Sequence, residues 1–205
     1  MIAILLSLIC GYLLGSVPFG LFAGRLHGVD VREHGSKNIG ATNVWRVCGR
    51  KYGLPVFFLD AAKGAAAVWI GNAMAVHWGG DVAWCMVIGA MACVLGHSFP
   101  VWLKFKGGKG VATSLGAIIG LMWKVSLIVF ALWAVLFAIT RYVSLASIVA
   151  AAAFPIVAFF FGARGPMLGF AVIATALVIV RHKSNIQRLL AGTEKRFGGK
   201  KEASS

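Results

Sequence analysis

The sequence predicts an all-α integral membrane protein with seven transmembrane helices, and three observations carry this prediction. Of its 205 residues, 60% are hydrophobic, and the mean hydropathy of +0.86 is too high for an ordinary soluble domain. Uncharged runs such as 1–24 and 142–163 reach the roughly 20 residues that span a bilayer. The basic residues lie between such runs, as topology signals do, so the net charge of +14 does not indicate nucleic-acid binding.

Hydrophobic length delimits the expected spans. They cover residues 2–24, 52–77, 82–97, 110–122, 125–140, 145–162 and 166–181. The first lacks the positive n-region of a signal peptide, so we expect a retained helix. The fourth is short, and we expect it to be tilted or to begin below the membrane surface, surrounded by protein. The whole chain, 1–205, is expected to form one membrane-embedded domain.

The basic residues predict the orientation. Most of the 20 Lys and Arg residues lie in segment 25–51, in loop 104–109, after the fifth span, and in the tail, which includes Lys200 and Lys201. The opposite side carries only Lys124 and Arg164. Positive loops remain in the cytoplasm, so we expect the N-terminus outside and the C-terminus and all basic loops in the cytoplasm.

Small residues and cysteines support a plain helical bundle. Glycine pairs such as Gly11/Gly15 and Gly116/Gly120 have the spacing of close helix contacts within a bundle. The cysteines form no C-x-x-C pair, so we expect free thiols and no metal site. They are Cys10, Cys48, Cys85 and Cys93.

A glycine–lysine loop, KFKGGKG at 104–110, interrupts two apolar runs. Glycine tolerates left-handed dihedral angles, so the N–H groups of Gly107 and Gly108 can converge on one oxyanion that the lysines attract. A helix beginning near Gly110 would aim its first N–H groups at the same anion. A plain turn is the alternative. No hydroxyl residue follows Lys109, which excludes the nucleotide P-loop motif.

Three further polar clusters fall on the same predicted side of the membrane. They contain Ser36, Asn38, Thr42, Asn43 and Arg46; Ser144 and Ser147; and His182 with Asn185. Hydroxyls, amides and a planar guanidinium suit a phosphate, and His182 and Asn185 have the spacing of one helical face. Each cluster alone would be ordinary for a cytoplasmic loop. All four together favour a site for a phosphorylated molecule.

Asp60 and Lys63 interrupt the second span three residues apart. Charged side chains within a bilayer are costly and mark a polar interior. One interpretation is a mutual salt bridge that holds the helix. The other places Lys63 near the anion site. The sequence leaves both open.

Three motifs resemble the PlsY-type acyl-phosphate:glycerol-3-phosphate acyltransferases of bacteria. They are SKNIGATN at 36–43, GGKGVAT at 107–113 and HKSNIQRLL at 182–190, followed by Gly192 and Glu194. The resemblance covers residues 15–197. Lys37 stands where glycine is common in that family, so no role is assigned to it.

The resemblance implies an enzyme of the bacterial plasma (inner) membrane with its active site facing the cytoplasm. It would transfer a fatty acyl group from acyl phosphate to the 1-hydroxyl of sn-glycerol 3-phosphate. The products would be lysophosphatidate and phosphate, in the first acylation of phospholipid synthesis, without cofactor or metal. Membrane lipids and an acyl-phosphate synthase are the expected partners, and nucleic acid is not.

The expected site combines a catalytic and a substrate-binding set. The catalytic set is Ser36, Arg46, Lys109, His182 and Asn185. The substrate-binding set is Asn38, Thr42, Asn43, Lys104, Gly107, Gly108, Ser144 and Ser147. Arg46 would clamp a phosphate, and Lys109 would stabilise developing charge. The proton acceptor is either His182 or a phosphate oxygen of a substrate.

Two other functions compete with this interpretation. A transporter for a phosphorylated metabolite would carry polar groups near the bilayer midplane, whereas here they gather at one face. A binder of anionic lipid headgroups needs only basic loops and leaves the neutral Ser, Thr and Asn side chains of segment 36–43 unexplained.

Overall fold

The computed structural model describes residues 1–198, which form helices and no strand; Lys200 and Lys201 lie outside the described residues. The longer helices are α1 (Ile2–Gly15), α4 (Arg50–Trp78), α5 (Val82–Ser98), α6 (Val111–Thr140), α7 (Val143–Phe160) and α8 (Gly165–Arg181). The shorter ones are α2 (Phe19–Leu26), α3 (Ala41–Cys48), η1 (Val101–Leu103) and α9 (Lys183–Leu190).

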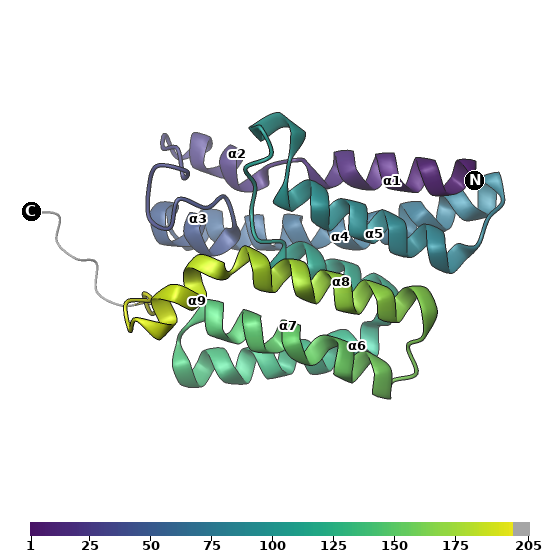
Figure 1. The fold of residues 1–205 in the computed structure, drawn as a ribbon. Coiled ribbons are helices and arrows are strands. Elements are labelled where there is room, and N and C mark those ends of the chain that lie inside the picture. Colours follow the sequence, from purple (N-terminus) through teal and green to yellow (C-terminus); the bar gives the residue numbers. More distant parts are fainter. Residues whose placement is uncertain (199–205) are drawn as a thin grey trace, which may run out of the picture.

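The helices form two groups that lie side by side (Figure 1). One group contains α1, α4 and α5, and the other contains α6, α7 and α8. The short helices α2, α3 and α9 gather at the end of the bundle opposite the N-terminus. This end therefore collects the polar segments that the sequence placed on one side of the membrane.

Within residues 1–198, five segments are long and apolar enough to cross a membrane. They are Ile2–Leu26, Arg50–Trp78, Val82–Leu103, Val111–Thr140 and Val143–Phe160. A sixth is the pair α8 and α9, which is bent by 58°. The predicted spans 52–77, 82–97, 145–162 and 166–181 agree with α4, α5, α7 and α8 to within two residues. Span 2–24 is broken between α1 and α2.

Apart from Gly110, the predicted spans 110–122 and 125–140 both fall within α6, which is interrupted at Met122 (φ −148°, ψ 66°). A straight helix of 30 residues would be about 45 Å long. Yet Gly110, just before α6, and Phe137, near its end, line the same cavity. The two halves of α6 must therefore fold back on each other at Met122.

Close helix contact explains the glycine pairs. A Cβ added to Gly15 would lie 2.1 Å from the carbonyl oxygen of Cys93 on α5, and one added to Gly116 would lie 1.7 Å from that of Ala61 on α4. Both positions therefore exclude any larger residue, and the expectation of close packing within the bundle is confirmed. The four cysteines are free thiols, as predicted.

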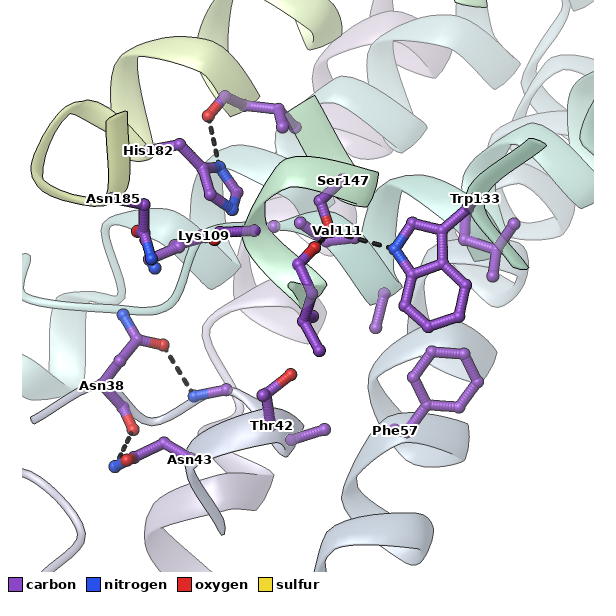
Figure 2. A pocket seen from close by; sticks show the side chains of 18 of the residues that line it. Asn38, Thr42, Asn43, Phe57, Lys109, Val111, Trp133, Ser147, His182 and Asn185 are labelled. Carbon is purple, nitrogen blue, oxygen red and sulfur yellow. Dashed lines mark hydrogen bonds between the residues drawn. The ribbon is translucent and has the colours of Figure 1, made fainter. Parts of the chain in front are cut away.

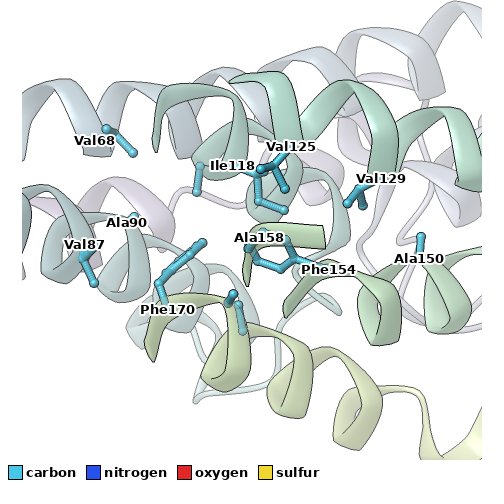
Figure 3. Close-up of a cluster of buried hydrophobic side chains, with 13 residues drawn as sticks. Val68, Val87, Ala90, Ile118, Val125, Val129, Ala150, Phe154, Ala158 and Phe170 are labelled. Carbon is cyan, nitrogen blue, oxygen red and sulfur yellow. The ribbon is translucent and has the colours of Figure 1, made fainter. Parts of the chain in front are cut away.

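Apolar side chains of α4, α5, α6, α7 and α8 pack together in the largest buried cluster (Figure 3). At its centre, Phe154 of α7 meets Phe170 of α8 edge to face, with ring centroids 6.1 Å apart. Edge-to-face aromatic pairs add stability beyond their buried area. This cluster closes one end of the cavity described next.

Candidate functional site

A cavity of about 660 Å³ opens among α3, α4, α6, α7, α8 and α9 (Figure 2). Its outer part is polar and includes Ser36, Arg46, Lys109 and His182. Its inner part, hereafter the apolar limb, is lined by aliphatic and aromatic side chains. These are Leu115, Ile118, Val129, Phe130, Trp133, Ala150, Ala151, Phe154, Ala174 and Val178. One cavity therefore offers both a cationic and an apolar environment.

Asn43 organises the loop that precedes α3. Its amide nitrogen donates to the carbonyl oxygens of Val31, His34 and Asn38 at 2.9, 3.1 and 2.8 Å. Its amide oxygen accepts from the N–H of Ser36 at 2.7 Å. Asn43 lines the cavity, but with only 2% of the residue exposed these four hydrogen bonds give its amide a positioning role in the loop. Its predicted contact with substrate stays a prediction.

The other predicted residues of this loop also line the cavity. Ser36, Asn38 and Thr42 line it, and Asn38 also accepts a 2.8 Å hydrogen bond from the N–H of Gly40. Arg46 also lines the cavity. Within residues 1–198, its guanidinium makes no hydrogen bond or ion pair with another residue. Burial lowers the pKa of Arg46, although a guanidinium stays charged. An unpaired cation in a partly buried cavity is a ready site for an anion.

The glycine–lysine loop does not form the predicted nest. The N–H of Gly107 donates to the carbonyl of Ser98 at 3.2 Å, and that of Gly108 donates to the carbonyl of His97 at 3.0 Å. Their own carbonyls accept from Arg181, each at 3.0 Å. Neither N–H is therefore available for a phosphate, so that prediction is wrong for these two amides, and neither glycine lines the cavity.

These glycines instead permit close approach. A Cβ on Gly108 would lie 2.1 Å from Nε2 of His97, and one on Gly107 would lie 2.2 Å from the His97 carbonyl oxygen. The loop packs directly against His97. Lys109, the next residue, lines the cavity. Lys104, by contrast, is exposed and outside the cavity, so its predicted contact with substrate is not supported.

The expected helix start near Gly110 is confirmed. Gly110 adopts a left-handed φ of 79°, and α6 begins at Val111. Val111 and Ala112 line the cavity beside Lys109. The first N–H groups of a helix lack intrahelical partners and favour anions. The groups at this loop that are available to an anion are therefore Lys109 and the first N–H groups of α6.

Lys109 is part of a hydrogen-bonded network with α9 and the segment that follows it. The Lys109 ammonium donates to the amide oxygen of Asn185. The Asn185 amide donates to Glu194 at 2.6 Å, as does the Ser144 hydroxyl. Arg188 donates to the other carboxylate oxygen at 2.7 Å. Glu194 thus joins α7 to α9 and, through Asn185, to Lys109.

Burial and charge set the protonation of this network. Burial lowers the pKa of Lys109 to about 8, and the neighbouring arginines Arg188, Arg181 and Arg46 act in the same direction. Burial raises the pKa of Glu194, but its hydrogen bonds from Ser144, Asn185 and Arg188 outweigh that effect and leave it below its ordinary value. Glu194 is therefore a carboxylate at neutral pH.

His182 lies between α8 and α9 and faces Lys109 across the cavity (Figure 2). Its Nδ1 lies 2.7 Å from the carbonyl oxygen of Val178. A carbonyl only accepts, so Nδ1 carries the hydrogen and Nε2 is left with a lone pair. Burial, with the charge of Lys109, lowers the pKa of His182 to about 4. The imidazole is neutral at pH 7 and can accept a hydrogen bond through Nε2.

Ser147 lines the cavity with a committed hydroxyl. It donates to the carbonyl of Val143 at 2.8 Å and accepts from the Trp133 indole N–H at 3.1 Å. It therefore fixes a wall of the apolar limb. Ser147 thus holds Trp133, and its predicted role in binding substrate stays a prediction.

The charges within the second predicted span form a buried cluster with a third residue. Lys63 Nζ lies 2.7 Å from Asp60 Oδ1 and 3.0 Å from Nδ1 of His97. It also donates to the carbonyl of Val17, at the break between α1 and α2, at 3.0 Å. The salt bridge expected under the structural interpretation is present, and through His97 the cluster supports the glycine–lysine loop.

Sequence reasoning missed three residues of this site: Glu194, Arg181 and Arg188. Glu194 was named with the third motif, but no role in the site was assigned to it, because it lies beyond the last predicted helix. Its place directly after the 182–190 motif was the available signal. Arg181 was counted as a topology charge, and nothing local indicates that it binds the carbonyls of Gly107 and Gly108.

Comparison with known proteins agrees with this geometry. A protein-family model described as glycerol-3-phosphate acyltransferase matches residues 5–192. A glycerol-3-phosphate acyltransferase of Rhizobium meliloti (strain 1021) is 47% identical over 96% of this chain and 93% of its own. One from Thermosynechococcus vestitus is 48% identical over 95% of this chain and 94% of its own.

Two solved structures share the fold. Both are of PlsY, described as an integral membrane glycerol 3-phosphate acyltransferase, in a glycerol 3-phosphate form and a lysophosphatidic acid form. Their TM-scores are 0.88 and 0.85, at 46% and 45% identity over 95% of both chains. The chain therefore belongs to the PlsY-type family of integral membrane glycerol-3-phosphate acyltransferases.

Proposed function

We propose that this protein transfers an acyl chain from acyl phosphate to the 1-hydroxyl of sn-glycerol 3-phosphate, which yields lysophosphatidate and inorganic phosphate. One observation carries the proposal: a single cavity joins a cationic outer part to the apolar limb. An acyl phosphate has the matching construction, with an anionic head and an apolar chain. The relatives solved with glycerol 3-phosphate and lysophosphatidic acid support the acceptor and the product.

Two anions need two cationic positions. Arg46 approaches from α3, and Lys109 with the start of α6 approaches from the other side of the cavity. A guanidinium can hold a phosphate through two parallel hydrogen bonds. We assign Arg46, with Ser36 and Thr42 beside it, to the phosphate of the acceptor. Lys109 and the α6 N-terminus are assigned to the phosphate that leaves.

In the reaction, the 1-hydroxyl oxygen attacks the acyl carbonyl carbon, and the bond from that carbon to the phosphate oxygen breaks. Lys109 stabilises the charge that develops on the departing phosphate. The lone pair on His182 Nε2 accepts a hydrogen bond from the hydroxyl and orients it. With a pKa of about 4, His182 is a weak base at neutral pH, so we assign the proton to an oxygen of the departing phosphate, and the protein positions the two groups.

The proposed topology has seven spans, with the two halves of α6 counted separately. The N-terminus lies outside, and the cavity mouth faces the cytoplasm of a bacterial cell, where the basic loops belong. In this arrangement the apolar limb lies within the bilayer, so an acyl chain never leaves an apolar environment. An acyl-phosphate synthase is the proposed source of the donor.

The deciding experiment supplies glycerol 3-phosphate and either palmitoyl phosphate or palmitoyl-CoA to the purified protein in detergent. Phosphate release and lysophosphatidate are measured. We expect product from palmitoyl phosphate alone. Product from the CoA thioester alone would overturn the donor assignment.

Matched arginine variants test the site. Arg46→Ala should lower kcat/KM for glycerol 3-phosphate by about 100-fold or more, as the loss of an electrostatic donor does. Arg50 is an exposed arginine near the same end of the bundle, and it lies outside the cavity. The activity of the Arg50→Ala variant should therefore match the wild type. Equal activity of the two variants would contradict the assignment of Arg46.

A further inference from the structure

The apolar limb of the cavity ends at a closed wall. The innermost lining residue on each surrounding segment is Ile118 and Val129 on the two halves of α6, Phe154 on α7 and Ala174 on α8. Each of these four side chains is no more than 7% exposed. All four belong to the buried cluster that α4, α5, α6, α7 and α8 share. The limb therefore stops on tightly packed core and does not continue along the helices.

Phe154 is the largest of these four side chains and has no space behind it. Phe170, itself 1% exposed, meets its ring edge to face at 6.1 Å, and Ala158 and Ala171 belong to the same cluster (Figure 3). None of these three supporting residues lines the cavity. A packed interior resists displacement of a side chain, so the Phe154 ring is a fixed boundary.

Two polar contacts hold the helices that form the limb. Pro155 has no N–H and cannot bond the carbonyl four residues earlier, that of Ala151. The Thr175 hydroxyl of α8 donates to that carbonyl at 2.7 Å. On the other side, Trp133 donates to Ser147 at 3.1 Å. These two hydrogen bonds fix the spacing of α7 from α6 and from α8 next to the limb. The small side chains of Ala150 and Ala174 leave the limb open.

The length of the limb follows from α7. Ser144, in the polar network, and Phe154, at the closed end, lie ten residues apart, a helical rise of about 15 Å. An extended polypeptide backbone has three bonds per residue and advances ~1.2 Å per bond. We apply the same advance per bond to an extended acyl chain. With the reacting carbonyl taken to lie level with Ser144, beside the polar network, the limb accommodates about 12 bonds of an extended acyl chain before the Phe154 ring.

We propose that Phe154 is the end stop that determines which acyl-chain lengths this enzyme prefers, with Ala174 opposite it setting the width of the closed end. The proposal rests on the proposed function, because the apolar limb must hold the donor's acyl chain. It makes Phe154 a specificity-determining residue. A chain that ends at Phe154 fills the limb, and a longer one must bend.

The test is a series of donors from decanoyl to stearoyl phosphate at saturating glycerol 3-phosphate. For the wild type, kcat/KM should rise with each added methylene up to lauroyl or myristoyl phosphate and then level off. Each methylene that enters an apolar site contributes a factor of roughly four. Phe154→Ala should raise the stearoyl-to-lauroyl ratio of kcat/KM about tenfold, and Ala174→Leu should lower it about tenfold.

Val87→Ala is the matched control, because Val87 belongs to the same buried cluster and does not line the cavity. It should leave the ratio unchanged. The opposite directions expected for Phe154→Ala and Ala174→Leu separate the proposal from general loosening of the core. If Phe154→Ala fails to fold, Ala174→Leu and the additional variant Ala150→Leu provide the test.

The two failures are distinguishable. If no acyl phosphate is used at any length, the proposed function fails, and the same series offered as CoA thioesters then tests the end stop. If acyl phosphates are used but the wild type and both limb variants share one length profile, the end stop is overturned while the proposed function stands.

Discussion

The amide of Asn185 donates a 2.6 Å hydrogen bond to Glu194 while its oxygen accepts one from Lys109. The carboxylate thus fixes, through one intermediate, the position of the lysine assigned to the departing phosphate. Glu194→Ala removes the acceptor shared by Asn185, Ser144 and Arg188. Hydrogen bonds to charged groups contribute about 1.5–3 kcal/mol, so we expect kcat/KM to fall roughly 10- to 100-fold.

The Glu194→Gln variant refines this prediction. A glutamine oxygen still accepts from Asn185 and Ser144, so its loss of kcat/KM should be smaller than that of Glu194→Ala. Glu33→Ala is the control, because Glu33 is an exposed carboxylate outside the cavity. Steady-state kinetics in detergent measure all three. Wild-type kinetics for Glu194→Ala would show that the network does not position Lys109.

The pKa values predict an alkaline limit to activity. Burial lowers the pKa of Lys109 to about 8, so the ammonium is lost as the pH rises through that value. If kcat/KM needs the charge, it falls about tenfold per pH unit above pH 8. Burial also lowers the pKa of His182 to about 4. Protonation of His182 should therefore not lower kcat/KM near the ordinary pKa of histidine.

Lys109→Arg is the matched variant for this pH dependence. A guanidinium stays charged throughout the accessible range, so whatever activity the variant keeps should lose its fall above pH 8. Measurement of kcat/KM between pH 6 and pH 10 shows the difference. The same alkaline limb in both proteins would assign it to a group other than Lys109.

The sequence predicted the positions of most helices because hydropathy is a local property. Spans 82–97 and 166–181 agree with α5 and α8 to within one residue. The break between α1 and α2 was not predicted, because Pro18 lies in an uninterrupted apolar run. Lys124 indicated the fold-back in α6, since a charge between two apolar runs marks a loop.

The site was predicted as a set of residues but not as a set of interactions. Arg46, Lys109 and His182 meet in one cavity as expected, because polar loops on one side of a bundle converge. Which group bonds which depends on approach in three dimensions. For that reason the sequence did not predict that the N–H groups of Gly107 and Gly108 already donate to backbone carbonyls.

Lys37 adopts a backbone conformation that favours glycine. Its φ of 56° lies in the left-handed region that glycine adopts without strain. The glycine that the family resemblance implies at this position would therefore have a conformational explanation. No substrate contact needs to be invoked for it.

Gly108→Ala is expected to damage the site through geometry alone. The new Cβ would lie 2.1 Å from Nε2 of His97, whose ring is buried and bonded to Lys63 at 3.0 Å. The loop must therefore shift, and Lys109 shifts with it. A displacement of about 1 Å at a reacting centre can cost about 100-fold in rate, so we expect a loss of that size in kcat.

Gly169→Ala is the matched control, because a Cβ there meets nothing within 4 Å. It should keep wild-type activity and stability. The two variants are compared by kinetics and by thermal unfolding followed through tryptophan fluorescence. Wild-type kinetics for Gly108→Ala would mean that the loop absorbs the added carbon without moving Lys109.

The buried pair of Asp60 and Lys63 predicts a coupled effect on stability. Both side chains are 2% exposed, so Asp60→Asn leaves the Lys63 ammonium without a counter-charge in an apolar interior. Breaking a buried pair in this way typically costs about 3–5 kcal/mol. Lys63→Met alone leaves the Asp60 carboxylate similarly uncompensated, apart from His97 at 3.4 Å. Each single variant should therefore unfold at lower temperature than the wild type.

The double variant Asp60→Asn/Lys63→Met removes both charges together. Replacing a buried ion pair by neutral groups is often close to neutral in stability, so we expect the double variant to be more stable than either single variant. Thermal unfolding of all four proteins in one detergent gives the coupling energy of the cycle. Additive losses would show that Asp60 and Lys63 stabilise the bundle independently, with His97 and the Val17 carbonyl as the partners that matter.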